Sequence, residues 1–308
     1  MKISYLKLAI CALLMLCTVS IQAKNPIAAL SKRPIKTLLI TGQNNHYWQN
    51  SYVQLSKLMT DSGLFDVDVA ISPEDGKPMD NFIIDFTPYR LVVLDYNGDA
   101  WPEETNKNFL EFVTKGGGVV VYHAADNAFT NWKEYNEIIA LGGWYGRDEK
   151  SGPYVYWKND GLVKDYSAGH GGSHGDRYPY VMNSRNTKHP IVKGLPEKWM
   201  HVTDELYDRM RGPGNIETLL YTAYAVPEKG GSGREEPLLF TVKYGNGRIF
   251  HTMLGHVGSE TDHAAIECVG FQVTFLRGCE WAATGRVTQP VPANFPTETQ
   301  VSTQKIIE

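Results

Sequence analysis

Short apolar stretches alternate with amphipathic ones along the first half of the chain. The apolar stretches are rich in β-branched residues and bounded by turn residues, which predicts buried strands at 37–42, 65–71, 91–96 and 119–123. Apolar residues recur at helical spacing between them, over 48–61 and over 102–115, where Pro102 favours a helix start and Gly116 a stop. Strands that alternate with helices are typical of an α/β fold with a doubly wound, mostly parallel sheet.

The pattern changes after a third helical stretch at 132–141. Residues 142–187 are rich in Gly, Tyr, Trp and His and show no periodicity, so we expect an inserted loop region there. Regular elements then return as a strand at 218–224, a hairpin of 237–244 and 248–254 around a Gly-Asn-Gly turn, and a closing helix over 264–283. From residue 286 onward, prolines among Thr, Gln and Glu predict an extended or disordered tail, 286–308.

The closing helix carries two further expectations. Ser259 and Asp262 form a candidate capping pair at its start, and Gly285 stands where a helix ends. Cys268 and Cys279 lie 11 positions apart, which at about 1.5 Å per residue is roughly 16 Å. Because a disulfide needs Cα atoms within about 7 Å, we expect both cysteines to be unpaired and buried.

The first 23 residues have the layout of a cleavable signal peptide. Lys2 and Lys7 precede an apolar run at 8–19, and small and polar residues follow it up to Ala23. A membrane anchor is the alternative, but a run of about a dozen residues is shorter than the roughly 20 that span a bilayer. We therefore expect a periplasmic or secreted protein without a membrane span after cleavage, with a linker at 24–35 before the domain.

Charge and size restrict the classes of function and the number of domains that the chain can have. The 308-residue chain has a net charge of −4 with neutral histidines. Removing residues 1–23 removes two lysines and no acid, which makes it −6. Basic residues do not cluster, so the electrostatic footprint of a nucleic-acid-binding protein is missing. The remaining length suits one large domain, which we place at 36–285, and we expect a monomer or a small homo-oligomer.

Several separated motifs resemble those of the ThuA-like (trehalose-utilisation) family. They are TGQNNH at 41–46, GGGVVVYHAA at 116–125, KHPIVKGLP at 188–196 with DELY at 204–207, GRIFHTMLGH at 247–256 and WAATG at 281–285. The resemblance covers roughly residues 36–285. It implies a flavodoxin-like sheet similar to that of class I glutamine amidotransferases, and a role in bacterial use of disaccharides, including through 3-keto-sugar intermediates.

Four candidate functional residues are expected at the same edge of the sheet. In a doubly wound sheet, ligands bind outside the carboxyl ends of the strands. His46, His123 and His256 each end or follow a predicted strand there, and Glu205 follows the turn at 188–196. Three histidines with a carboxylate or water suit a divalent metal, most of all zinc. The alternative is that each histidine only hydrogen-bonds its own loop.

Further candidate residues are expected around this edge of the sheet. Glu205 is the expected general acid or base, with Asp204 as a helix cap or support, and His174 in a glycine-rich loop is a second catalytic candidate. Asp126 is expected on the same rim. Aromatic side chains that offer faces to a sugar ring are Trp48, Tyr122 and Trp144, with Tyr145 and Trp157 as further members. We expect His189, His201 and His251 to be structural.

A glutaminase activity does not follow from the resemblance. That chemistry needs a cysteine on the sharp turn after a central strand, and the turn at 121–125 reads Val-Tyr-His-Ala-Ala. We therefore expect an enzyme without a nucleotide cofactor that acts on a glycoside or 3-keto-sugar through a histidine-bound divalent metal and a carboxylate. The alternatives are a non-catalytic carbohydrate-binding protein and a structural partner in a secreted complex.

Overall fold

Five parallel strands form the half of the sheet that carries most of the predicted site. The protein is described here by a computed structural model that covers residues 33–306, so the predicted signal peptide and most of the linker lie outside the described residues. The parallel strands run in the order β2 (Phe65–Ile71), β1 (Ile35–Thr41), β3 (Leu91–Leu94), β4 (Gly118–Tyr122) and β11 (Gly247–Thr252). All residues of β3 and β4 are buried, because helices cover both faces of the sheet.

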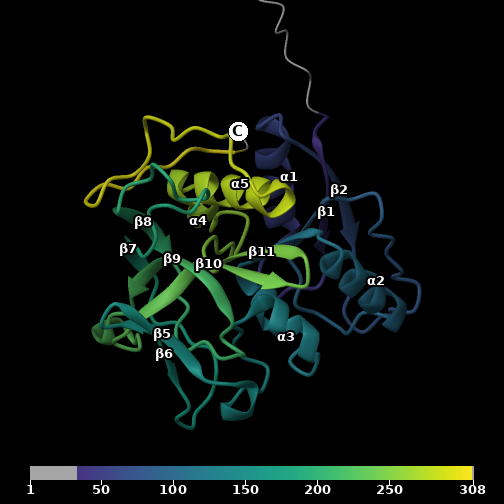
Figure 1. The fold of residues 1–308 in the computed structure, drawn as a ribbon, viewed down its shortest axis with the longest axis horizontal. Coiled ribbons are helices and arrows are strands. Elements are labelled where there is room, and N and C mark those ends of the chain that lie inside the picture. The colour runs from purple at the N-terminus through teal and green to yellow at the C-terminus, as the bar shows by residue number, and fades with distance from the viewer. Residues whose placement is uncertain (1–32, 307–308) are drawn as a thin grey trace, which may run out of the picture. The chain divides into compact units, whose positions relative to one another are not determined.

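Two pairs of helices enclose the parallel half (Figure 1). Helices α1 (Trp48–Asp61) and α5 (Val269–Thr284) contact each other on one face, and α2 (Glu103–Thr114) and α3 (Lys133–Ile139) lie on the other. Neighbouring residues of β11 show the two faces. The ring of Phe250 leaves room only for a glycine at position 278 of α5, whereas His251 Nδ1 donates to the Ile139 carbonyl of α3, 2.8 Å away.

The other half of the sheet is antiparallel, which corrects the predicted fold. It adds β10 (Glu235–Tyr244), β9 (Ile216–Tyr224), β7 (Tyr178–Ser184) and β8 (Lys198–Asp204), with β5 (Tyr154–Lys158) and β6 (Gly161–Asp165) paired beside β10. Six strand pairs are antiparallel and four are parallel. The predicted α/β class is confirmed, and the sheet is large and mixed. The prediction that the sheet is mostly parallel was wrong.

The expected loop region at 142–187 is largely folded into that antiparallel half. It contains β5, β6 and β7, together with a short 3-10 helix at Glu149–Ser151. These strands are only five to seven residues long. The exposure of β5 and β7 does not alternate cleanly and β6 has no buried residue, so no apolar period of two marks them. Strand β8, which delivers Glu205, was missed for the same reason. Two other 3-10 turns occur, at His123–Asn127 and Pro227–Lys229.

The closing helix is interrupted at Cys268. Helix α4 (Ala264–Glu267) ends there, Cys268 is extended with φ −60° and ψ 122°, and α5 begins at the next residue. The proposed caps Ser259 and Asp262 form a turn ahead of the helix instead, with Asp262 N donating to Ser259 Oγ over 3.1 Å. Gly285 ends α5 in the left-handed conformation that a glycine tolerates.

The chain after α5 has an extended course and is ordered by backbone contacts. Val269 N donates to the Ser302 carbonyl (2.9 Å) and Met200 N to the Thr297 carbonyl (2.7 Å), which fix the tail against α5 and β8. Both Cys268 and Cys279 are free and buried, as expected. Among residues 33–306, no helix has the length and apolar content to cross a bilayer.

Candidate functional site

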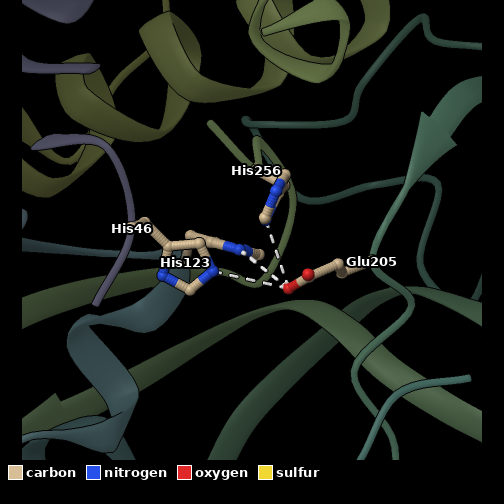
Figure 2. Close-up of side chains that lie close together, drawn as sticks. All are labelled: His46, His123, Glu205 and His256. Atoms are coloured by element: carbon tan, nitrogen blue, oxygen red, sulfur yellow. Dashed lines mark hydrogen bonds and ion pairs between the residues drawn. The ribbon is translucent and has the colours of Figure 1, made fainter. Parts of the chain in front are cut away.

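Loops that follow strands bring His46, His123, Glu205 and His256 together, and these four residues are called the His/Glu cluster below. His46 follows β1, His123 follows β4 directly and His256 follows β11, so all three leave the carboxyl ends of parallel strands. Glu205 comes from the antiparallel half, directly after β8. The four side chains point toward one another in Figure 2.

One carboxylate oxygen lies at the centre of the cluster. Glu205 Oε2 is 3.5 Å from His46 Nε2, 3.7 Å from His123 Nε2 and 3.2 Å from His256 Nδ1. One ligand atom from each residue lies within 4.8 Å of all the others. Tetrahedral ligands about 2.0–2.1 Å from a zinc ion lie roughly 3.4 Å from one another, so the spacing fits a shared cation.

Hydrogen bonds on the outer nitrogens orient two of the imidazoles. His123 Nδ1 donates to the Met253 carbonyl over 2.7 Å, and His46 Nδ1 lies 3.3 Å from Asn44 Oδ1. With their protons on Nδ1, both rings turn Nε2 toward the centre, where His123 Nε2 also lies 3.1 Å from the Tyr207 hydroxyl. His256 Nδ1 is buried without a hydrogen-bond partner among the described residues, although it faces Glu205. Such an orphaned nitrogen suits a metal ligand.

The charges of the cluster also suit a cation. Burial acts to raise the pKa of Glu205, but the facing imidazoles of His123, His256 and His46 outweigh it and hold the pKa far below its usual range. Burial lowers the pKa of His46 to about 4, so this ring is neutral near pH 7. Burial also lowers the pKa of His123, but Glu205 and Asp204 raise it above the ordinary value. An ionised carboxylate among imidazoles therefore attracts positive charge.

Backbone strain concentrates at this edge. His123 has φ 44°, a left-handed conformation that costs a non-glycine residue roughly 1–2 kcal/mol. Trp144 and Tyr145 have φ 52° and 44°. Gly255, directly before His256, has φ 102°, and a Cβ there would lie 2.7 Å from the rings of Phe271 and Tyr122. Strain of this kind persists where the surrounding structure holds a functional geometry.

Asp204 ties the loop after β8 to the loop after β11. Its Oδ1 accepts from the backbone N–H groups of Glu205 (2.8 Å) and His256 (3.2 Å), and its Oδ2 accepts from Gly255 N (2.8 Å). Oδ2 also accepts from His201 Nε2 over 2.7 Å, and both side chains are fully buried. Asp204 thus holds two members of the cluster by their backbones.

A cavity of about 330 Å³ opens onto the cluster and is called the reaction cavity below. Its walls include His46 and Glu205, and the remaining lining residues are Asn45, Asn127, Trp144, Tyr145, His174 and Tyr207. His174 stands at its more exposed side, with Nε2 3.6 Å from Glu205 Oε1. Its Nδ1 donates to the Gly175 carbonyl over 2.9 Å, so Nε2 is free to accept a proton.

Tyr207 and Asn127 are among the residues of this cavity that could not be identified from the sequence. Tyr207 stacks on His123 at 4.5 Å between ring centres, and its hydroxyl lies 3.1 Å from His123 Nε2. Asn127 lines the cavity from the 3-10 turn after β4. Neither belongs to a pattern that signals chemistry, although Tyr207 lies two positions after Glu205 in the DELY motif.

The other predicted site residues divide into those that line a cavity and those that are buried. Trp144 lines the reaction cavity and Trp48 lines a neighbouring one. Tyr122 and Asp126 were expected at the rim, which is wrong. Tyr122 is buried and donates to the Gly255 carbonyl, and Asp126 is fully buried with Oδ2 3.3 Å from His251 Nε2.

The remaining histidines lie outside the cluster. His201 and His251 are buried beneath the site, bonded to Asp204 and Asp126, and His189 packs at a tilt against Trp281. Trp157 lies on β5 under Arg185, 5.1 Å from the guanidinium carbon, and lines neither cavity. The positions of the three histidines agree with the structural roles expected for them, whereas Trp157, expected to face a sugar ring, lies outside both cavities.

Comparison with known proteins gives consistent results. The family model described as ThuA, trehalose utilisation, matches residues 36–282. A ThuA-like protein from Parabacteroides merdae is 68% identical, with a TM-score of 0.88 over 89% of this chain and 99% of that one. A ThuA-like protein from Bacteroides uniformis is 16% identical, with a TM-score of 0.54 over 85% and 96%, which shows the fold alone. No curated protein matches the chain.

Proposed function

The chain belongs to the ThuA family, and from that premise we propose that it is an exported enzyme that acts on a glycoside or 3-keto-sugar at a metal-bound His/Glu cluster. The single observation that carries the proposal is the convergence of four metal-ligand atoms within 4.8 Å at the wall of a cavity. Export rests on the predicted signal peptide at 1–23.

The cluster residues would hold a divalent metal, with zinc the best match to three imidazoles and one carboxylate. When bound, such an ion would act as a Lewis acid toward a carbonyl or hydroxyl oxygen of the sugar. Glu205 was expected to carry a proton, but a carboxylate that stays ionised between three imidazoles is better suited to be a ligand. If Glu205 is a ligand, proton transfer requires another side chain of the cavity.

His174 is the side chain best placed to exchange that proton. Its Nε2 faces the cavity, its Nδ1 is held by a backbone carbonyl, and its exposure lets the proton pass on to water. The hydroxyl of Tyr207, which lines the same cavity next to His123, can donate a hydrogen bond to a bound oxygen. Trp144 offers an aromatic face at the same cavity, which suits the apolar face of a sugar ring.

The test compares His174→Ala with His170→Ala, an exposed histidine of the same glycine-rich segment that does not line the cavity. We expect His174→Ala to lower turnover of 3-keto-glycosides or plain disaccharides by about 10² to 10⁴, the usual worth of a proton-transfer group. Its metal content should stay at the wild-type value, and His170→Ala should keep full turnover.

Two results would contradict the proposal. Equal turnover in His174→Ala and wild type would remove His174 from the mechanism. A wild-type protein that binds sugars but turns over none of them would favour the non-catalytic carbohydrate-binding function.

A further inference from the structure

A second cavity of about 750 Å³ adjoins the reaction cavity and is called the neighbouring cavity below. The two cavities share Asn45, Asn127 and Tyr145 in their walls, so they lie directly against each other beside the His/Glu cluster. Both volumes fall in the range of small-molecule sites, about 300–1,000 Å³. A ligand larger than one ring can therefore extend from the cluster into the neighbouring cavity.

The lining of the neighbouring cavity favours a neutral polyhydroxyl ligand. Amide side chains predominate, among them Asn45, Gln49 and Asn127, and each amide offers both donors and acceptors. Trp48 and Tyr145 add aromatic faces. The cavity also contains three carboxylates and no lysine, arginine or histidine, so a phosphorylated or acidic ligand would be repelled.

Asn127 stands between the cavities with unused hydrogen-bonding capacity. The residue is 3% exposed, and its Oδ1 has no hydrogen-bond partner among the described residues. Burying such an oxygen without a partner costs about 1–3 kcal/mol, so it calls for a ligand group. The backbone of Asn127 is fixed, because its carbonyl accepts from the buried Arg147 guanidinium over 2.8 Å.

Tyr145, which also lines both cavities, has its backbone held in place. Its backbone has a positive φ of 44°, and its carbonyl accepts from Thr130 Oγ1 over 3.1 Å, while its side chain remains 55% exposed. Arg147, two positions on, also binds the Gly143 carbonyl over 2.8 Å and so anchors the same loop. An exposed ring on an anchored, strained backbone suits a stacking platform for a sugar.

We propose that the neighbouring cavity is a binding site for a second, unphosphorylated sugar ring, joined to the reaction cavity through Asn127 and Tyr145. This inference rests on the proposed function for the identity of the ligand as a sugar. The ring that reacts lies at the cluster, and the ring in the neighbouring cavity contributes affinity and selectivity for a neutral two-ring substrate.

The test is a calorimetric binding panel of trehalose, maltose and cellobiose against glucose and trehalose 6-phosphate. We expect at least one disaccharide to bind about tenfold or more tightly than glucose, and the phosphorylated form to lose that advantage. Asn127→Ala and Tyr145→Ala should each bring disaccharide affinity close to that of glucose. Tyr166→Ala, which removes a ring that is 71% exposed and lines neither cavity, should leave the panel unchanged.

His46→Ala separates this inference from the proposed function. The variant removes a proposed metal ligand, so it should lose metal and turnover but keep the preference for disaccharides. If the wild type prefers disaccharides but binds no metal and turns over no sugar, the second site is supported and the proposed metal enzyme is contradicted. A turning-over enzyme that binds no disaccharide more tightly than glucose, or a Tyr145→Ala variant that keeps the full preference, overturns the second site.

Discussion

His123 shows how one residue type at one backbone position changes the chemistry of a strand end. It stands on the turn directly after β4, with φ 44°, where a nucleophilic cysteine or serine would be needed for acyl transfer. An imidazole there is a ligand or base, and its Nδ1 is already engaged by the Met253 carbonyl. The strained turn therefore presents Nε2 to the cluster.

Glu205 is the residue whose proposed role differs most from the role expected from the sequence. Its Oε2 faces three imidazole nitrogens at 3.2–3.7 Å, and its pKa is held far below the usual range. A proton carrier works best with a pKa near the working pH, which this environment opposes. A carboxylate ligand gains from the same environment.

Glu205→Gln should therefore weaken zinc binding by tenfold or more, measured by competition with a chromogenic chelator. The amide keeps the shape of the side chain but removes the charge that attracts the cation. Glu260→Gln, on an exposed loop outside the cavity, is the matched control and should bind zinc like wild type. Wild-type zinc affinity in Glu205→Gln together with a large loss of turnover would return Glu205 to the proton-transfer role.

At the scale of elements, the site depends on a junction between the loop after β8 and the loop after β11. Asp204 makes that junction with one carboxylate that accepts from three backbone N–H groups and from His201. His201 is held in turn by Cys268, whose Sγ lies 3.3 Å from Nδ1 at the break between α4 and α5. The helix interruption and the loops that carry Glu205 and His256 thus share one buried network.

Asp204→Asn should lower both stability and metal affinity. The amide has one acceptor oxygen for four donors, so buried N–H groups lose partners, and breaking a buried charged pair costs about 3–5 kcal/mol. Misplacing groups that orient metal ligands lowers metal affinity by about 10- to 100-fold. Thermal melts and chelator competition measure the two effects.

Asp61→Asn, at the exposed end of α1, is the control for that prediction and should change neither quantity. Asp204→Asn with wild-type zinc affinity and a lowered melting temperature would mean that Asp204 supports the fold but does not position the ligands. An unchanged melting temperature would contradict the network itself.

At the scale of the whole molecule, patterns in the sequence predicted the parallel half and the histidines that follow its strands. Buried strands such as β3 and β4 read as continuous apolar runs because helices cover both of their faces. Once those strands are known, the carboxyl-edge rule brings His46, His123 and His256 to one place. This rule is enough to predict that residues far apart in sequence lie close together in the fold.

The antiparallel half and the finer roles could not be predicted in the same way. Strands β5 to β7 are short, β5 and β7 are irregular in exposure and β6 has no buried residue, so tertiary pairing and not local pattern decides their conformation. Tyr122 and Asp126 lie within three positions of His123 in sequence, but the strand pleat and the sharp turn bury them. Asn127 and Tyr207 acquire a role only from their place in the cavity wall.

The central claim is that His46, His123, Glu205 and His256 bind one divalent cation, and anomalous X-ray diffraction at the zinc edge tests it most directly. Crystals grown with equimolar zinc should show one strong peak among His46 Nε2, His123 Nε2, His256 Nδ1 and a Glu205 carboxylate oxygen, about 2.0–2.2 Å from each. The peak should be absent in His46→Ala crystals grown in the same way. Wild-type crystals without a peak at this position, or with zinc held only by other side chains, would contradict the account.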